Sequence, residues 1–235
     1  MKHRSPAFPP LMSLFLITVA CLSLLAGCSP TTSASSPKPN TIVYRDHILT
    51  AKDGVEGALY GTYAKMRTSS LYGQELSFST IDVMGGYHSC KGNKTVEALL
   101  KYDYNYSAIE STFSGVWTEM YSNISAVNNI LGCSLLDNPT QYPYTVYRGE
   151  ALGLRAFMHF DLMRLYAEQI TTNPQADGIP YATEFSLKTP DFESLAKNYE
   201  LVIADLLEAE RLLAGEDNHR NETYFMTSRH IHCNL

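Results

Sequence analysis

The spacing of apolar residues predicts a chain with a short apolar leader, a polar stretch and a long helical body. In the body, apolar side chains recur every three or four residues, as on one face of an α-helix, over about residues 50–66, 112–132, 147–165 and 192–213. Amphipathic helices joined by turns bury their apolar faces on one another. The pattern therefore predicts an all-α fold of tetratricopeptide-like antiparallel helix pairs, arranged as an α-α superhelix.

Long irregular loops are predicted between these helices. The helical period is lost over residues 68–111, where glycines and tyrosines accumulate. Such a segment inside a compact domain is either functional or contains short elements that the pattern does not reveal. A second loop, residues 171–190, is marked by Asn173-Pro174 and by Asp177-Gly178-Ile179-Pro180.

The N-terminus predicts a lipoprotein signal peptide. Lys2 and Arg4 precede an apolar stretch, residues 11–26, which is shorter than the roughly 20 residues that span a bilayer. The motif Leu-Ala-Gly-Cys, which has the form of a bacterial lipobox, follows and ends at Cys28. We therefore expect that residues 1–27 are removed and that the Cys28 thiol is lipidated. The alternative is a plain signal peptide or an N-terminal membrane anchor.

The composition bears on three further features: a tether, the net charge and the cysteines. Residues 28–40 are rich in Ser, Thr and Pro and predict a flexible tether before the body, residues 41–235. The chain has a net charge of −6, and no clustered basic surface that would bind nucleic acid is evident. The body holds three cysteines, which are Cys90, Cys133 and Cys233. Because this number is odd, the sequence leaves two alternatives open: one disulfide bridge, or three free thiols.

Catalytic and metal-binding patterns are not evident. The carboxylates of residues 200–210 alternate with Leu and Ala, which is typical of a solvated helix face rather than of paired acids in a cleft. His230, His232 and Cys233 are metal-ligating residue types, but no fourth ligand stands in register. His159 is interpreted as a packed or hydrogen-bonded histidine. We therefore expect neither an enzyme nor a bound metal or cofactor.

Four blocks of the body follow one another in a recognisable order. They are Trp117-x-x-x-Tyr121-x-x-Ile124-x-x-x-Asn128, Arg148-Gly-Glu150-Ala151-x-x-Leu154-Arg155-Ala156-x-x-x-Phe160-Asp161-Leu162-x-Arg164-Leu165-Tyr166, Asp177-Gly-Ile179-Pro180, and Tyr199-x-x-x-Ile203-x-Asp205-Leu206-x-x-Ala209. Together, and after a lipobox, they resemble the RagB/SusD family of outer-membrane nutrient-binding lipoproteins. The resemblance covers most of residues 45–230, and it implies that residues 41–235 are a SusD-like N-terminal helical domain that is incomplete at its C-terminus.

The resemblance implies a binding function without catalysis. Such a protein is a cell-surface lipoprotein of the outer membrane that binds oligosaccharides, such as starch-type glycans, and delivers them to a TonB-dependent transporter of the SusC type. Two alternatives stay open: a peptide-binding uptake subunit like RagB, and a helical-repeat lipoprotein that docks another protein. Acidic residues are absent just after Cys28, so anchoring on the periplasmic leaflet is an alternative location.

The irregular, tyrosine-rich segment supplies the predicted ligand site. Sugars stack on aromatic rings and accept or donate hydrogen bonds through their hydroxyls, which directs attention to Asp82, Tyr87, Asn93, Tyr72 and Tyr102. The alternative is that these tyrosines fill gaps between loops and helices. Trp117 and residues 149–166 are predicted to be core and scaffold. Four charged residues are predicted to form a buried polar network between helices, away from the ligand: Arg148, Glu150, Arg155 and Asp161.

Overall fold

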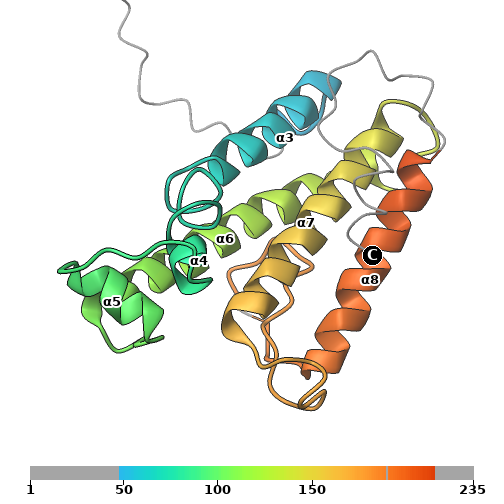
Figure 1. Cartoon of the computed structure of the whole chain (residues 1–235). Coiled ribbons are helices and arrows are strands. Elements are labelled where there is room, and N and C mark those ends of the chain that lie inside the picture. The colour runs from blue at the N-terminus through green and yellow to red at the C-terminus, as the bar shows by residue number, and fades with distance from the viewer. Residues whose placement is uncertain (1–47, 189, 215–235) are drawn as a thin grey trace, which may run out of the picture. The chain divides into compact units, whose positions relative to one another are not determined.

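The computed structural model describes residues 48–188 and 190–214. Their helices are α3 (Lys52–Met66), α4 (Thr80–Met84), α5 (Lys94–Leu100), α6 (Ser107–Leu131), the 3-10 helix η1 (Ser134–Leu136), α7 (Tyr144–Tyr166) and α8 (Leu195–Leu213) (Figure 1). In these residues the β-type pairing is a single antiparallel bridge between Asp177 and Ser194. The predicted signal peptide, Cys28, the tether and the group His230, His232 and Cys233 lie outside the described residues.

Helix α7 lies between α6 and α8, and it runs antiparallel to both (Figure 1). Trp117, in the first half of α6, contacts Tyr166 at the end of α7, with ring centroids 4.9 Å apart. Gly149, near the start of α7, faces Leu213 at the end of α8. The predicted all-α fold of tetratricopeptide-like antiparallel helix pairs is therefore confirmed.

The core follows the predicted apolar faces, and α7 is its central element. Residues 149–156 of α7 are all buried, because α3, α6 and α8 all pack against this helix. A methyl group added to Gly149 would lie 2.8 Å from Leu213 Cγ and 3.3 Å from Ala209 O. The absence of a side chain at Gly149 thus permits the close approach of α7 and α8.

The segment predicted to be irregular contains two short helices, α4 and α5. They bury a small apolar cluster of their own against the first turn of α6: Val83, Ala98, Leu99 and Ile109. Asn93 caps α5, since its Oδ1 accepts hydrogen bonds from the backbone N–H groups of Thr95 and Val96 at 3.1 and 3.2 Å. Residues 68–111 therefore contain short elements that the apolar pattern does not reveal, which is one of the two alternatives left open, and α6 begins at Ser107, ahead of the predicted start at about residue 112.

Two predicted helix starts also shift. Helix α7 begins at Tyr144, three residues before the predicted start. Helix α8 begins at Leu195, because Ser194 caps it by accepting a hydrogen bond from Lys197 N at 3.2 Å, and Phe192 lies exposed in the preceding loop. None of the helices in the described ranges combines the length and the apolar character that a membrane span requires.

Candidate functional site

The loop that connects α7 to α8 includes residues 177–188, here called the crossing segment. Side chains of the helices hold this segment in place. Tyr121 Oη donates to Pro180 O at 2.8 Å, and Asn128 Nδ2 donates to Ala182 O at 2.8 Å. Both donors belong to α6. Because most of the crossing segment forms neither helix nor sheet ladder, these side chains satisfy backbone groups that regular structure would otherwise pair.

His159 of α7 holds the same segment from a fully buried position. Its Nε2 accepts a hydrogen bond from Ala182 N at 3.1 Å, which assigns the proton to Nδ1, 2.9 Å from Arg155 O. The ring stacks on Tyr181, with centroids 3.8 Å apart. Burial lowers the pKa of His159 to about 3, so the ring is neutral at physiological pH. His159 is thus a packed, hydrogen-bonded histidine, as the sequence predicts.

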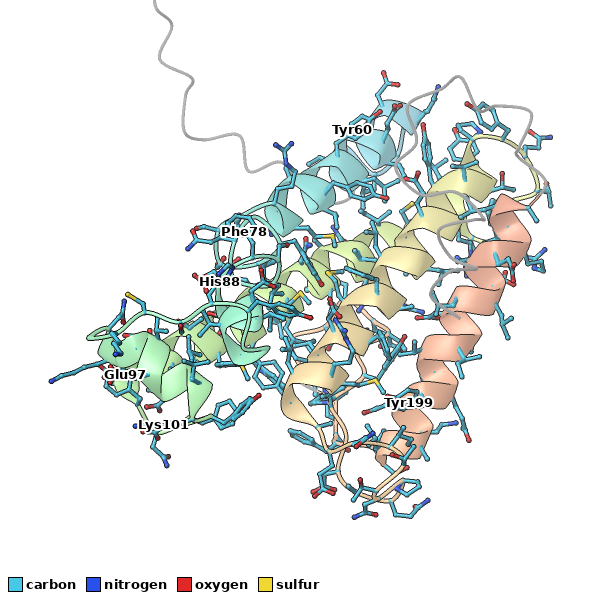
Figure 2. All side chains as sticks on the ribbon, viewed as in Figure 1. Tyr60, Phe78, His88, Glu97, Lys101 and Tyr199 are labelled. Carbon is cyan, nitrogen blue, oxygen red and sulfur yellow. The ribbon has the colours of Figure 1, made fainter. Side chains whose placement is uncertain are left out.

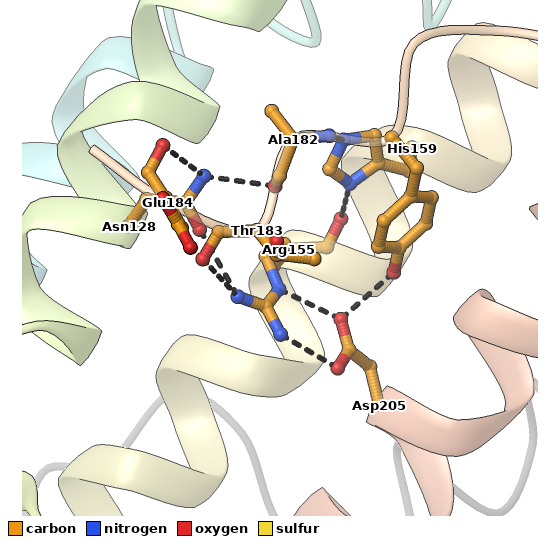
Figure 3. A network of polar contacts seen from close by, with 8 residues as sticks. Asn128, Arg155, His159, Ala182, Thr183, Glu184 and Asp205 are labelled. Atoms are coloured by element: carbon orange, nitrogen blue, oxygen red, sulfur yellow. Dashed lines mark hydrogen bonds and ion pairs between the residues drawn. The ribbon is translucent and has the colours of Figure 1, made fainter. Parts of the chain in front are cut away.

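Arg155 and Asp205 form the central ion pair between α7 and α8 (Figure 3). Arg155 Nε and Nη2 donate to the two carboxylate oxygens of Asp205, each at 2.7 Å, and Tyr181 Oη donates to Asp205 Oδ2 at 2.7 Å. Arg155 Nη1 also donates to Thr183 O and to Asn128 Oδ1, both at 3.1 Å. The ion pair therefore links α6, α7 and α8 to the crossing segment.

The electrostatics of this pair follow from its burial. The side chains of Arg155 and Asp205 are only 10% and 13% exposed. Burial by itself would lower the pKa of Arg155, but the hydrogen bonds and the charge of Asp205 outweigh burial, so that pKa lies above its usual value. Little water reaches the two charges in the interior, so each charge is stabilised by the other.

The start of the crossing segment is fixed by α8. Asn198 Oδ1 accepts a hydrogen bond from Ile179 N at 2.6 Å. A methyl group added to Gly178 would lie 2.0 Å from the same Oδ1, so only glycine leaves room for this contact. The Asp-Gly-Ile-Pro block therefore serves to bring the backbone against α8.

Three of the four charged residues of the predicted polar network bind separate partners in the structure. Asp161 accepts a hydrogen bond from Tyr72 Oη at 2.6 Å. Arg148 Nη1 donates to Leu136 O at 2.8 Å, and Arg155 binds Asp205. These three residues do not share a partner, because positions along α7 face different neighbouring elements.

A first hollow, the polar hollow, lies beside the crossing segment and has a volume of about 470 Å³. Trp117 and Tyr121 of α6 form its aromatic wall, and Thr183, Glu184 and Lys188 supply hydroxyl and charged groups from the crossing segment. The hydrogen bonds described above fix the backbone that carries Thr183 and Glu184. The polar hollow therefore combines aromatic rings with polar groups on a constrained loop.

A second hollow, the aromatic hollow, has a volume of about 750 Å³ and is lined by four aromatic rings: Tyr104, Phe113, Trp117 and Tyr166. Adjacent rings meet almost at right angles, at 80° for Tyr104 and Phe113, 86° for Phe113 and Tyr166, and 82° for Trp117 and Tyr166. Tyr166 Oη donates to Phe113 O at 2.6 Å, which ties the end of α7 to α6.

Trp117, the single tryptophan of the chain, lines both hollows. Its ring contacts that of Tyr121, with centroids 4.8 Å apart. The sequence predicts Trp117 as core, and its side chain does pack against the core, but it is only half-buried. Val116 and Met120 occupy the fully buried face of α6, so Trp117 stands at the edge of that face.

The five predicted ligand residues are not among the side chains that line these two hollows. Tyr72 Oη donates a hydrogen bond to Asp161, and the Asn93 side chain caps α5, so both residues have structural partners. Tyr102 Oη donates to Met84 O at 2.8 Å. Tyr102 also lines a third hollow of about 350 Å³, together with Asp161.

Of the other two predicted residues, Asp82 is half-buried and Tyr87 is exposed. Asp82 Oδ2, on α4, lies 3.8 Å from Nε2 of His88, the residue labelled in Figure 2. Tyr87 is 80% exposed and lies close to Gly85 at the end of α4. A ligand role for these two residues stays a prediction.

In the described ranges, no cluster of three or more His, Cys, Asp or Glu side chains has a metal-binding arrangement. Cys90 is exposed and Cys133 is buried, and both are free thiols.

Residues 51–229 match the sequence profile of a SusD-like family that is described as "Starch-binding associating with outer membrane". This match extends over most of the chain. The chain belongs to the SusD-like family.

Relatives of known sequence or structure share this assignment at low identity. SusD-like protein P2 of Formosa agariphila is 24% identical over 210 residues, which are 86% of this chain and 38% of the relative. A SusD superfamily protein from Bacteroides thetaiotaomicron is 22% identical, with a TM-score of 0.56 over 68% of this chain and 37% of the other. A SusD-like carbohydrate-binding protein from Bacteroides vulgatus is 24% identical, with a TM-score of 0.54 over 68% of this chain and 35% of the other. The structural likeness shows the fold, and the chain spans little more than a third of each of these proteins.

Proposed function

We propose that the protein is a lipid-anchored, glycan-binding subunit of the outer membrane that holds oligosaccharides in the polar and aromatic hollows. The observation that carries this proposal is the position of Trp117, whose half-buried ring lines both hollows. A sugar ring presents apolar C–H groups on its faces and hydroxyls around its edge. Aromatic rings beside fixed polar groups suit that pattern, as in other ligand pockets.

Two adjacent hollows favour a chain of sugar units over a single unit. The polar hollow supplies hydrogen-bonding groups from the crossing segment, and the aromatic hollow supplies ring surfaces from α6 and α7. An oligosaccharide can occupy both hollows across Trp117. The family description and the carbohydrate-binding relative support glycan binding, and the matches extend to less than half of each relative's length.

Ligand binding is tested by fluorescence and calorimetry on the purified protein. Because Trp117 is the single tryptophan, its emission reports on the proposed site alone. We expect a panel of neutral oligosaccharides to contain ligands that change this emission saturably, with the dissociation constant that calorimetry gives. A panel of peptides tests the alternative ligand class, and peptide binding without any oligosaccharide binding would contradict the proposal.

A steric block separates loss of the site from loss of the fold. Ser114 is exposed on α6 and lines the aromatic hollow, so Ser114→Phe fills the hollow without removing a core side chain. We expect this variant to bind oligosaccharides at least tenfold more weakly while its circular dichroism is unchanged. Glu119→Gln, on an exposed side chain of the same helix that does not line the hollow, serves as the matched control.

The anchor and the partner are further parts of the proposal. We expect Cys28 to carry the lipid and a TonB-dependent transporter of the SusC type to receive the glycan. Metabolic labelling with palmitate, lost in Cys28→Ser, tests the anchor. A specific complex with the product of a neighbouring transporter gene favours uptake over a free-standing adaptor. Sequencing the locus beyond codon 235 tests whether the body is part of a longer domain.

A further inference from the structure

The aromatic hollow carries a single charged lining residue, Glu110. Glu110 lies in the first turn of α6, where the helix dipole favours a negative charge. Its side chain is exposed, and in the described ranges it forms no ion pair with a lysine, arginine or histidine. Among the described residues, therefore, a carboxylate without a cationic partner lies at the wall of a ring-lined hollow.

The rings of this hollow pack edge to face against one another. Tyr104, Phe113, Tyr166 and Trp117 meet in succession at 80°, 86° and 82°, so neighbouring rings lie in different planes. A flat neutral sugar needs only one ring as a platform. Several ring faces in different planes, with a carboxylate nearby, provide the environment in which organic cations are bound by cation–π attraction.

The polar hollow differs from the aromatic hollow in the charged residues that line it. It is lined by Lys188 as well as by Glu184 and Asp191, so both signs of charge are present there. In the aromatic hollow the charge is of one sign only. The two hollows therefore present different charges to a ligand.

We propose that the aromatic hollow binds a sugar unit with a free amino group, so that the protein selects oligosaccharides that contain deacetylated amino sugars. This inference rests on the proposed function and narrows it to a ligand class. The protonated amine lies against the Glu110 carboxylate and the ring faces of Trp117 and Tyr166. The remaining, neutral units of the oligosaccharide extend into the polar hollow.

Two trimers that differ only in acetylation test the inference. The trimer of β-1,4-linked glucosamine and the trimer of N-acetylglucosamine have the same linkage and length, and only the first carries amines. Calorimetry and Trp117 fluorescence at about pH 6 should show the amine trimer binding about threefold to thirtyfold more tightly, the range expected for one exposed ion pair with one cation–π contact. The preference should disappear at about pH 9, where the amine is neutral.

The matched variants assign the preference to one carboxylate. Glu110→Gln should reduce the preference at about pH 6 to the roughly twofold to fivefold that one cation–π contact supplies, because the ion pair is lost and the rings are kept. Glu119→Gln, on the same helix but outside the lining, should keep the full preference. Equal binding of both trimers by the unmodified protein, or a preference that Glu110→Gln leaves undiminished, would overturn the inference.

The outcomes also separate this inference from the proposed function. If neutral oligosaccharides bind and the amine trimer binds no more tightly than they do, the proposed selectivity is wrong and the proposed glycan binding stands. If no oligosaccharide of either kind changes the Trp117 emission or gives heat, both are wrong.

Discussion

The ion pair between Arg155 and Asp205 gives the sharpest test of how the crossing segment is held. The change is Asp205→Asn, which keeps the size of the side chain and removes its charge. Arg155, with a side chain only 10% exposed, then loses both charge-assisted hydrogen bonds of 2.7 Å or exchanges them for weaker neutral ones. Tyr181 Oη loses its charged acceptor as well.

The size of the effect follows from burial. Removing one partner of a buried ion pair costs about 3–5 kcal/mol, because the other charge stays buried without its counter-ion. For a body of this size that corresponds to a fall in Tm of roughly 6–20 °C. Urea unfolding followed by circular dichroism gives the free energy of unfolding, and thermal scans give the Tm.

The matched control is Glu208→Gln on the same helix. Glu208 pairs with Arg211 at 2.7 Å, but both side chains are exposed, so its loss should cost less than about 1 kcal/mol. A second variant, Arg155→Met combined with Asp205→Leu, should cost less than the sum of the single substitutions, because no unpaired charge remains buried. If Asp205→Asn costs no more than Glu208→Gln, the ion pair does not support the fold as described.

Three further predictions concern pH, packing and a buried hydroxyl. The pKa of His159 falls from 6.5 to about 3 on folding, so between these values the unfolded chain binds the extra proton. The free energy of unfolding should therefore decline as pH falls below 6.5, by up to about 1.4 kcal/mol per pH unit from this residue, and His159→Gln should flatten that slope in urea titrations. Gly149→Ala should lower the free energy of unfolding by about 1–3 kcal/mol through the clash with Leu213. Gly115→Ala, whose added methyl group meets nothing within 4 Å, should raise it by about 0.5–1 kcal/mol. Equal effects of the two substitutions in thermal scans would refute the packing argument. Tyr72→Phe should cost about 1.5–3 kcal/mol, since the Asp161 carboxylate loses a hydrogen bond of 2.6 Å, and an unchanged urea midpoint would show that this contact is not formed in solution.

The long helices could be predicted from the sequence, and the short ones could not. Helices α6, α7 and α8 each extend over at least 19 residues, so the apolar period repeats several times. Helices α4 and α5 have five and seven residues, which is too short for a period to become visible. The pattern therefore locates neither helix, although it leaves open that short elements lie in this tyrosine-rich segment.

The candidate site shows a different limit of sequence reasoning. Phe113, Trp117 and Tyr121 follow one another at intervals of four, which places three aromatic rings along one side of α6. That spacing is the signal that could have indicated the site. Periodicity alone does not distinguish a fully buried ring from a half-buried one at the edge of the same face, so Trp117 was assigned to the core.

The crossing segment could not be predicted, because its partners are distant in the sequence. Tyr121 binds Pro180, and Asn128 binds Ala182, more than 50 residues further along the chain. The Asp-Gly-Ile-Pro block predicts a turn, but the backbone groups that it presents find their partners only when α6, α7 and α8 have packed. Long-range packing therefore determines the polar hollow.

The most direct measurement is a titration of the single tryptophan, Trp117, with oligosaccharides in the unmodified protein and in Ser114→Phe. Binding in the hollows on either side of Trp117 should produce a saturable change in emission with the dissociation constant found by calorimetry, and that change should be lost when the aromatic hollow is filled. Calorimetric binding of oligosaccharides that leaves the Trp117 emission unchanged, or that persists undiminished in Ser114→Phe, would show that the ligand binds elsewhere.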